Sequence, residues 1–135
     1  MLTSWNWQDW YQALVKPSWT PTSGTISTIW TILYPLILIT FTVIFYRLIK
    51  KEIVLIVALP FIINLIANFA FTPILFGLKN LPLASFDILV VWLTIVWGMV
   101  AIFPHSKILA FLQIPYLIWV SIATFLQLSI TLMNR

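Results

Sequence analysis

Residues 26–46 read ISTIWTILYPLILITFTVIFY and contain no charged side chain. An α-helix rises about 1.5 Å per residue, so a helix of this length spans the roughly 30 Å hydrocarbon layer of a bilayer. No water is present in that layer to satisfy backbone polar groups, whereas a helix satisfies them within the segment itself. This stretch therefore predicts a transmembrane helix and an integral membrane protein.

Three more segments of the chain are long and apolar enough to span a bilayer, and only the third of the four spans, with Asp87, contains a charged residue. Spanning helices are expected at residues 26–46, 53–75, 85–103 and 108–133. The second contains Pro60 and Pro73, and Pro115 can bend the fourth, which is long enough to tilt. The connections between them are short, which makes sequential helices antiparallel neighbours. We expect an all-α bundle of four transmembrane helices.

The composition supports lipid as the solvent of this chain. Hydrophobic residues make up 62% of the sequence and charged residues only 7%, whereas soluble domains contain about 25% charged residues. The absence of cysteine excludes thiol chemistry, disulfides and thiolate-bound metals. No linker or repeat divides the sequence. Residues 1–135 are therefore expected to form one transmembrane domain, with a tryptophan-rich segment at 1–25 and the bundle at 26–135.

The basic residues lie mostly between the apolar segments. They are Lys16, Arg47, Lys50, Lys51, Lys79, Lys107 and Arg135. This placement is typical of helix ends, where basic side chains reach lipid headgroups, and it lacks the stripe typical of nucleic-acid binding. The connections at 47–52 and 104–107 hold four of them, so the positive-inside rule favours both termini outside. We expect a multi-pass protein of a bacterial cell membrane that does not bind nucleic acid.

The first part of the chain is rich in tryptophan and too short to span a membrane. Trp7, Trp10, Tyr11 and Leu14 follow the spacing of one helical face, and Pro17 ends the pattern. Indole and phenol rings favour the boundary between the apolar and polar layers of a bilayer, so a short interfacial helix is expected. This segment is either an anchor at the membrane surface or a lid over a pocket between the helices.

The sequence does not contain a set of residues typical of a catalytic centre or a metal site. His105 stands in a loop with no carboxylate near it, and Asp87 is the one acid in a hydrophobic segment. An acid in such a segment is a candidate functional residue. Ser85, however, is expected to cap the third helix and to place Asp87 in its first turn, where the helix dipole stabilises a negative charge. A structural role for Asp87 is therefore favoured.

Three of the predicted helices carry polar or aromatic residues at helical spacing. The pairs are Trp30 and Tyr34, Asn64 and Asn68, and Trp119 and Ala123, the last followed by Gln127. An amide that faces lipid leaves its hydrogen-bonding groups unsatisfied, so each stripe is expected to point inward. Either the amides simply join helices, or the stripes form a cavity whose flat aromatic walls suit a large, planar, mostly apolar ligand.

The ordered motifs of the chain resemble those of the TspO family, the tryptophan-rich sensory proteins related to the mitochondrial translocator protein. The resemblance covers nearly the whole sequence, and its loop and last-helix motifs are specific. It rests on Tyr11 and Leu14, on the loop KPSWTP at residues 16–21, on Trp30 with residues 33–34, on Asn64 and Asn68, on Asp87, and on PYLIWV at residues 115–120 followed by Ala123 and Thr124.

This resemblance implies a five-helix membrane fold that binds porphyrins and, in some members, sterols and drug-like ligands. It also implies frequent dimers and, in some members, porphyrin degradation in light. The chain lacks residues for the family's first spanning helix, so either the start codon has been placed too late or this member has four helices. Thr22 replaces a loop proline, and Gln127 replaces an asparagine. The sterol motif near the C-terminus lacks its tyrosine, which puts sterol binding in doubt.

The function expected from the residues and the resemblance together is that of a membrane receptor or carrier for a porphyrin, with no cofactor or metal of its own. Trp30 and Trp119 are expected to form the aromatic walls of the site, with Tyr34 beside Trp30, and Asn64 and Asn68 to supply hydrogen bonds. Tyr11 and Pro21 are expected to close its top, and Ala123 to leave room because it is small.

Two alternatives stay open beside this function. The first is an enzyme that degrades porphyrin in light, with Trp30 and Trp119 as electron donors. The second is a small four-helix drug exporter, which would need an acid deep in a membrane helix. A homodimer is also expected, because a four-helix monomer would expose surface near the asparagine stripe. Ala67 and Ala70 would allow close approach of the second copy.

Overall fold

The computed structural model describes residues 13–134, and the regular elements of that part of the chain are all helical. They are α2 (Ser23–Ile49), α3 (Leu55–Thr72), the π-helical turn η1 (Pro73–Gly77), α4 (Leu81–Ile102), α5 (Lys107–Leu112) and α6 (Ile114–Met133). Four stretches of this part are long and apolar enough to cross a membrane, at Gly24–Ile49, Leu55–Gly77, Leu81–Ile102 and Lys107–Met133. The prediction of an all-α, multi-pass membrane bundle is confirmed. The interfacial helix expected around Tyr11 lies outside the described residues.

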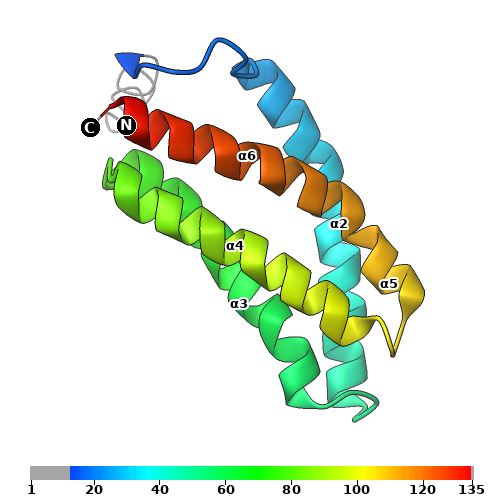
Figure 1. Ribbon diagram of the computed structural model, residues 1–135. Coiled ribbons are helices and arrows are strands. Elements are labelled where there is room, and N and C mark those ends of the chain that lie inside the picture. The colour runs from blue at the N-terminus through cyan, green and yellow to red at the C-terminus, as the bar shows by residue number, and fades with distance from the viewer. Residues whose placement is uncertain (1–12, 135) are drawn as a thin grey trace.

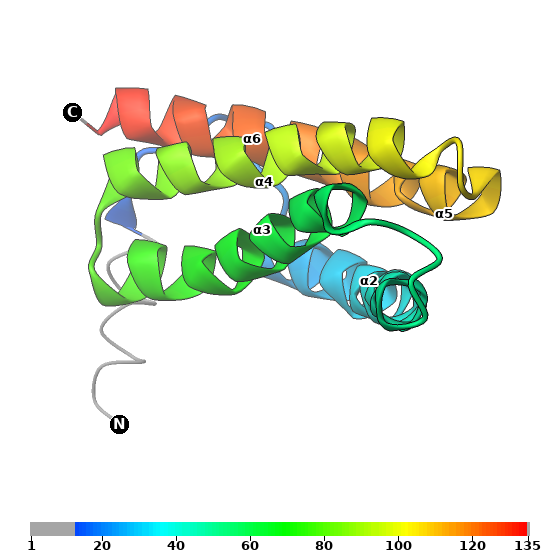
Figure 2. The same ribbon diagram turned by 90° about the horizontal axis from the view of Figure 1, so that it is seen from below.

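The spanning helices alternate in direction and form two layers. Figures 1 and 2 show α4 and α6 side by side in one layer, with α3 and α2 in the other. The most extensive contacts join α3 to α4 and α4 to α6, whereas α2 makes smaller contacts with α3, α5 and α6. In the bundle α4 therefore packs tightly on both α3 and α6, with α2 held more loosely against these helices.

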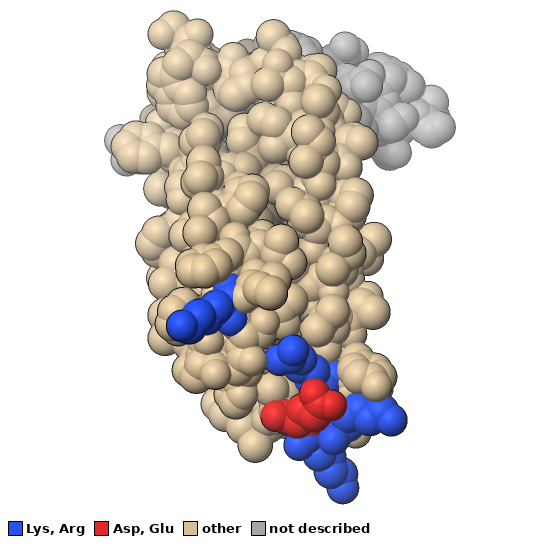
Figure 3. All heavy atoms as spheres, turned by 90° about the vertical axis from the view of Figure 1, so that its right-hand side faces the viewer, with Lys and Arg blue, Asp and Glu red and all other residues tan. Residues whose placement is uncertain are grey.

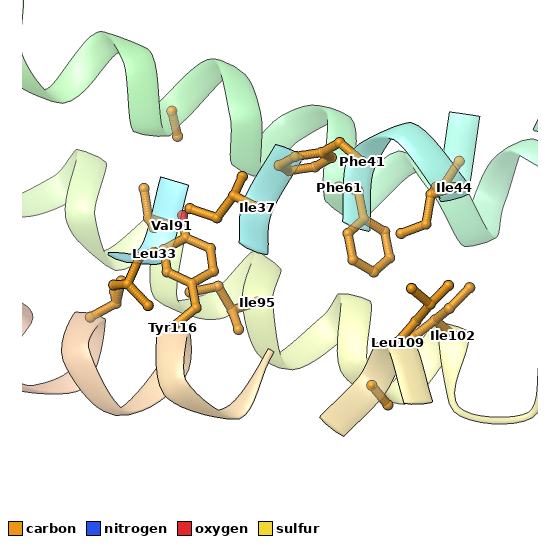
Figure 4. Packing of buried hydrophobic residues seen from close by; sticks show 14 of the residues in the cluster. Leu33, Ile37, Phe41, Ile44, Phe61, Val91, Ile95, Ile102, Leu109 and Tyr116 are labelled. Atoms are coloured by element: carbon orange, nitrogen blue, oxygen red, sulfur yellow. The ribbon is translucent and has the colours of Figure 1, made fainter. Parts of the chain in front are cut away.

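One continuous core cluster connects all the spanning helices. Figure 4 shows Phe41 and Ile44 of α2 pointing toward Phe61 of α3 and Ile102 of α4. The rings of Phe41 and Phe61 meet edge to face, with centroids 6.0 Å apart. Phe61 also lies on Gly98, where an added Cβ would come within 3.0 Å of the ring. The close approach of α3 and α4 therefore depends on the absence of a side chain at Gly98.

Large apolar side chains cover the outside of the bundle. Leu38, Ile66, Val100 and Phe125, one from each span, are 62–71% exposed. Such a surface is stable against lipid and would associate in water. Several threonine hydroxyls on the spans are satisfied locally, because each donates to the carbonyl four residues earlier. These threonines are Thr28, Thr31, Thr40, Thr42, Thr94 and Thr131.

The start of α4 differs from the sequence-based expectation. The side chain of Asn80 accepts a 3.0 Å hydrogen bond from the backbone N–H of Leu83, and this cap starts the helix at Leu81. Pro82 suits the first turn of a helix, where its missing N–H costs no hydrogen bond. The expected cap by Ser85 is therefore wrong, because its hydroxyl lies inside the bundle and faces α6. The third span begins one turn earlier than predicted.

A π-helical turn and one left-handed residue make the connection from α3 to α4. The N–H of Leu78 donates to the carbonyl of Pro73 at 3.0 Å, five residues earlier, which widens the last turn. Lys79 then adopts a φ of 52°, a conformation that residues other than glycine rarely take. The chain reverses at Lys79, and the connection shortens to the three residues between η1 and α4.

The last span is divided in two at Gln113. The bend expected at Pro115 is found there, because proline has no N–H to continue the helical ladder. The side chain of Gln113 stabilises the break from within the bundle: its Nε2 donates to the hydroxyl of Thr40 at 3.0 Å and to the carbonyl of Leu109 at 3.3 Å. The division thus contributes a cross-link between α2 and the last span.

Charged side chains gather at one end of the bundle. Figure 3 shows Lys and Arg side chains, together with an acidic residue, toward one end of the molecule. In the sequence they lie in or next to the connections from α2 to α3 and from α4 to α5. Arg47 joins these two connections through a 3.3 Å hydrogen bond from Nη1 to the carbonyl of His105. The positive-inside rule favours the cytoplasmic side for this end, and the orientation stays a prediction. His105 lies in a loop, as the sequence indicated.

The part of the homodimer prediction that was placed on Ala67 is wrong. Ala67 is 6% exposed and belongs to the core of the single chain. Ala70 is half-buried. Asn64 is buried and bonds inward, so the exposed amide edge that a second copy would have to cover is not formed by this residue. The homodimer stays a prediction.

Candidate ligand-binding site

Tyr116 of α6 joins the two amides of α3. Its hydroxyl donates to Oδ1 of Asn64 at 3.1 Å and accepts from Nδ2 of Asn68 at 2.6 Å. The side chain is 2% exposed, and Figure 4 shows it pointing into the bundle near Leu33 and Val91. Hydrogen bonds in such an apolar interior are not weakened by competing water. Tyr116 therefore links α6 to two successive turns of α3.

The two asparagines of α3 have different roles. Asn64 also donates from Nδ2 to the carbonyl of Val91 and to the hydroxyl of Thr94, both at 3.1 Å. Its amide is fully engaged within the protein, which agrees with the interpretation that it joins helices. Asn68 bonds only to Tyr116 among the described residues. Of the two, Asn68 keeps hydrogen-bonding capacity for a ligand.

Aromatic rings from α2 and α6 form a cluster beside these amides. Trp30 stacks on Tyr34 with centroids 5.1 Å apart and an interplanar angle of 26°. It meets Trp119 edge to face at 6.4 Å and 87°, and Tyr116 at 6.4 Å and 68°. These are the arrangements that aromatic pairs prefer. The two tryptophans predicted as walls are thus brought together, and in this conformation their rings contact each other.

The indole N–H of Trp119 is a buried donor in this cluster. The side chain is 6% exposed, and its Nε1 has no hydrogen-bond partner within residues 13–134. Leaving such a donor unsatisfied costs about 1–3 kcal/mol. Ala123, one turn further along α6, is partly buried against the same core. The face of α6 between them offers an unused donor next to a small side chain.

The two residues expected to close the site belong to the segment that precedes α2 in the sequence. Pro21 is half-buried and precedes Thr22, the N-cap of α2, and Tyr11 lies outside the described residues. The segment before α2 is held instead by Asn134 at the end of α6. Oδ1 of Asn134 accepts from the N–H of Val15 at 3.0 Å, and its Nδ2 donates to the Val15 carbonyl at 2.8 Å. The roles of Tyr11 and Pro21 stay predictions.

Asp87 lies deeper in the membrane segment than the sequence indicated. Because α4 begins at Leu81, Asp87 falls in its second turn, and the expected first-turn position is wrong. The side chain is 8% exposed, and its Oδ2 has no hydrogen-bond partner in the described part of the chain. Stabilisation by the helix dipole falls off within the first turn. The helix dipole therefore does not explain why an acid is present at position 87.

Tyr116 is the residue of the cluster that sequence reasoning missed. The signal is in the sequence, because Tyr116 precedes Trp119 by three residues and Ala123 by seven, which is the spacing of one helical face. Thr94 was missed as well, since a threonine in an apolar helix more often bonds to its own backbone. It does so here too, and in addition accepts from Asn64.

The region offers flat rings, amides and hydroxyl groups rather than a group of metal ligands. Within residues 13–134, the His, Asp and Glu side chains do not gather in threes that could hold a metal ion. Flat rings supply stacking surfaces, and amides supply directional hydrogen bonds. The arrangement suits non-covalent binding of a planar, mostly apolar molecule.

Comparison with known proteins places these features in a family. Residues 1–133 match the TspO/MBR family. The chain is 39% identical to the tryptophan-rich protein TspO of Bacillus cereus, over 93% of its own length and 80% of the relative. It is 35% identical to the membrane protein YtaB of Bacillus subtilis, over 94% of its own length and 81% of the relative. It is also 30% identical to the tryptophan-rich sensory protein of Cereibacter sphaeroides, over 93% and 77%.

Proposed function

Because the chain belongs to the TspO/MBR family, we propose that it is a membrane sensory or regulatory protein that binds a porphyrin between α2, α3 and α6. The sensory part is supported by the name of the Cereibacter sphaeroides relative, a tryptophan-rich sensory protein. The binding part is supported by one observation above the others. Trp30, Tyr34 and Trp119, from two helices, meet at one place beside the free amide groups of Asn68.

The aromatic residues suit the size and shape of a porphyrin. Trp30 and Trp119 present two large ring faces, and an aromatic contact contributes about 0.5–1.5 kcal/mol beyond the burial of its area. Tyr34 extends the surface toward the outside of the bundle, where its side chain is 41% exposed. A planar ligand can therefore rest partly on buried rings while its polar edge points outward.

The ligand enters by moving α2. Trp30 and Trp119 contact each other edge to face at 6.4 Å, so a macrocycle between them has to separate their rings. Trp119 belongs to α6, which packs extensively on α4, whereas Trp30 belongs to the loosely packed α2. Fewer packing contacts mean a lower cost of local displacement. The indole N–H of Trp119 and the free amide of Asn68 then become accessible to the ligand.

The test is the affinity for protoporphyrin IX, measured from the shift of its main absorption band with protein in lipid nanodiscs. Replacing Trp30 and Trp119 together by Leu keeps the helices hydrophobic and removes the stacking surfaces. We expect the affinity to fall by about tenfold or more. Trp97→Leu is the matched control, because Trp97 is partly exposed on the outer face of α4 and should leave the affinity unchanged. Unchanged affinity in the double variant would reject this site.

A second function, light-dependent porphyrin degradation, is favoured by the contact between Trp30 and Trp119. Adjacent indoles beside a photoexcited porphyrin can supply electrons while dioxygen acts as the oxidant. Trp30→Phe and Trp119→Phe keep an aromatic surface that is much harder to oxidise. Both should slow the light-driven loss of porphyrin while leaving its affinity nearly unchanged. Equal rates in the variants and in the original protein would indicate ordinary photobleaching.

A further inference from the structure

Asp87 is a buried carboxyl group that the proposed porphyrin site does not use. It is 8% exposed within the span Leu81–Ile102. Its Oδ2 is fully buried, and neither carboxyl oxygen takes part in a hydrogen bond or ion pair within residues 13–134. Acidic residues inside membrane spans are costly, and those that occur usually have a partner. The partner of Asp87 is therefore to be sought outside the described chain.

The position of Asp87 on α4 directs it toward α3. Val91 and Thr94 accept hydrogen bonds from Asn64 of α3, and Asp87 precedes them by four and seven residues, so it lies on the same face of the helix. Because α3 and α4 are antiparallel, the turn of α3 after Asn64 comes opposite the turn of α4 before Val91. That turn of α3 carries Asn68. Asp87 and Asn68 therefore lie on facing turns of the two helices.

Polar and aromatic groups connect this position to the aromatic cluster. Asn68 bonds to Tyr116 at 2.6 Å, and the ring of Tyr116 meets Trp30 edge to face at 6.4 Å. Asn68 keeps free amide groups beside this chain. A ligand whose aromatic part rests on Trp30 can therefore extend past Tyr116 and Asn68 toward the carboxyl group of Asp87.

From this arrangement we propose that Asp87 accepts a protonated amine, so that the pocket also binds planar aromatic ligands that carry a cationic nitrogen. A carboxylate in an apolar interior is stabilised most by a group that supplies both positive charge and N–H donors. The described chain does not pair Asp87 with any lysine, arginine or histidine. This inference rests on the proposed function for the aromatic half of the pocket, and it adds a ligand class that protoporphyrin, which has no amine, does not represent.

The experiment uses two fluorescent probes that differ only in the amine, aminomethylanthracene and methylanthracene. Binding to the full chain in lipid nanodiscs is followed by energy transfer from tryptophan to anthracene. The apparent affinity of each probe is compared between protein variants. The partition of the probe into lipid is the same for every variant, so it cancels from this ratio. Asp87→Asn should weaken binding of the amine by about tenfold or more and leave methylanthracene within about twofold. Thr124→Val is the matched control, since Thr124 is another buried polar group without a partner among residues 13–134, and it should change neither.

Equal affinity of the amine for the original protein and for Asp87→Asn would overturn the proposal, and so would an equal loss of both probes. If Asp87→Asn does not fold, the same two probes are measured with Asp87→Glu, which keeps the carboxyl group. If this variant still prefers aminomethylanthracene to methylanthracene, the proposal is supported, and if the preference is lost, the proposal is rejected. Protoporphyrin IX affinity in the same variants separates the two claims. If protoporphyrin still binds and still requires Trp30 and Trp119 while the amine test fails, only the role of Asp87 is rejected.

Discussion

The side-chain amide of Asn68 donates a 2.6 Å hydrogen bond to the hydroxyl of Tyr116, across the interface of α3 and α6. The same hydroxyl donates to Asn64, which in turn bonds to α4 through Val91 and Thr94. One phenol group thus completes a series of hydrogen bonds that joins α6, α3 and α4. The ring of Trp30 meets the ring of Tyr116, which lies in the middle of this series of hydrogen bonds, so fold stability and ligand binding depend on the same side chain.

Tyr116→Phe should destabilise the fold. The substitution keeps the ring but leaves Oδ1 of Asn64 and one hydrogen of the Asn68 amide without a partner. Measured side-chain hydrogen bonds in membrane bundles and the cost of unsatisfied buried groups together give a loss of about 1–2 kcal/mol in the free energy of unfolding. Unfolding by SDS in mixed micelles measures this loss. Tyr46→Phe is the control, because Tyr46 is exposed at the end of α2, and its unfolding should not change.

Asn134→Ala should release the segment that leads into α2. The side chain of Asn134 bonds to both the N–H and the carbonyl of Val15. Loss of that N–H bond should speed hydrogen exchange of the Val15 amide on the order of tenfold, without comparable change in the spans. Asn80→Ala removes another amide at the same end, which caps α4 and does not contact Val15. Faster exchange at Val15 in both variants would contradict a specific role for Asn134.

The architecture could be predicted from the sequence because insertion of a helix into a membrane depends on the hydrophobicity averaged over about 20 residues. Four long apolar stretches, of which only one contains a charged residue, and short connections suffice to specify an antiparallel bundle. The helix ends were less predictable, since they depend on single side chains. Asn80 competes with Ser85 for the start of α4, and both are good capping residues in isolation. Only packing decides between them, because the hydroxyl of Ser85 has a partner inside the bundle at Thr131.

The candidate site was predictable as a set of residues but not as a set of contacts. Helical spacing indicates that Asn64 and Asn68 share a face, yet it does not distinguish an amide that joins helices from one with free groups. That difference arises from α4 and α6, which supply Thr94 and Tyr116 from distant parts of the chain. The burial of Asp87 has the same origin, since it follows from where α4 starts and from how α3 packs on it.

A homodimer through α3 is tested by cysteine cross-linking in native membranes, which the absence of natural cysteines makes direct. Ala70→Cys places a thiol on a half-buried position of α3, and we expect it to form a disulfide-linked dimer under mild oxidation. Ala67→Cys is the control, because Ala67 lies in the core of the single chain and its thiol should not reach a second copy. A ligand-binding monomer without cross-links at Ala70 would reject a dimer through this face.

Gly98→Ala should show how closely α3 and α4 must approach. A Cβ at this position would lie 3.0 Å from Cζ and 3.2 Å from Cε2 of Phe61, closer than carbon atoms pack without strain. Phe61 has little room to yield, because it is 4% exposed and its ring also packs against Phe41. Overpacking of this kind costs about 1–3 kcal/mol, which outweighs the roughly 1 kcal/mol by which alanine favours a helix over glycine. The free energy of unfolding should therefore fall, and a shift of α4 should weaken the bonds of Asn64 to Val91 and Thr94.

Gly77→Ala is the matched control, because an added Cβ there meets nothing within 4 Å. It should leave stability unchanged or raise it slightly, so an equal loss in both variants would show that chain flexibility, rather than helix approach, explains the effect.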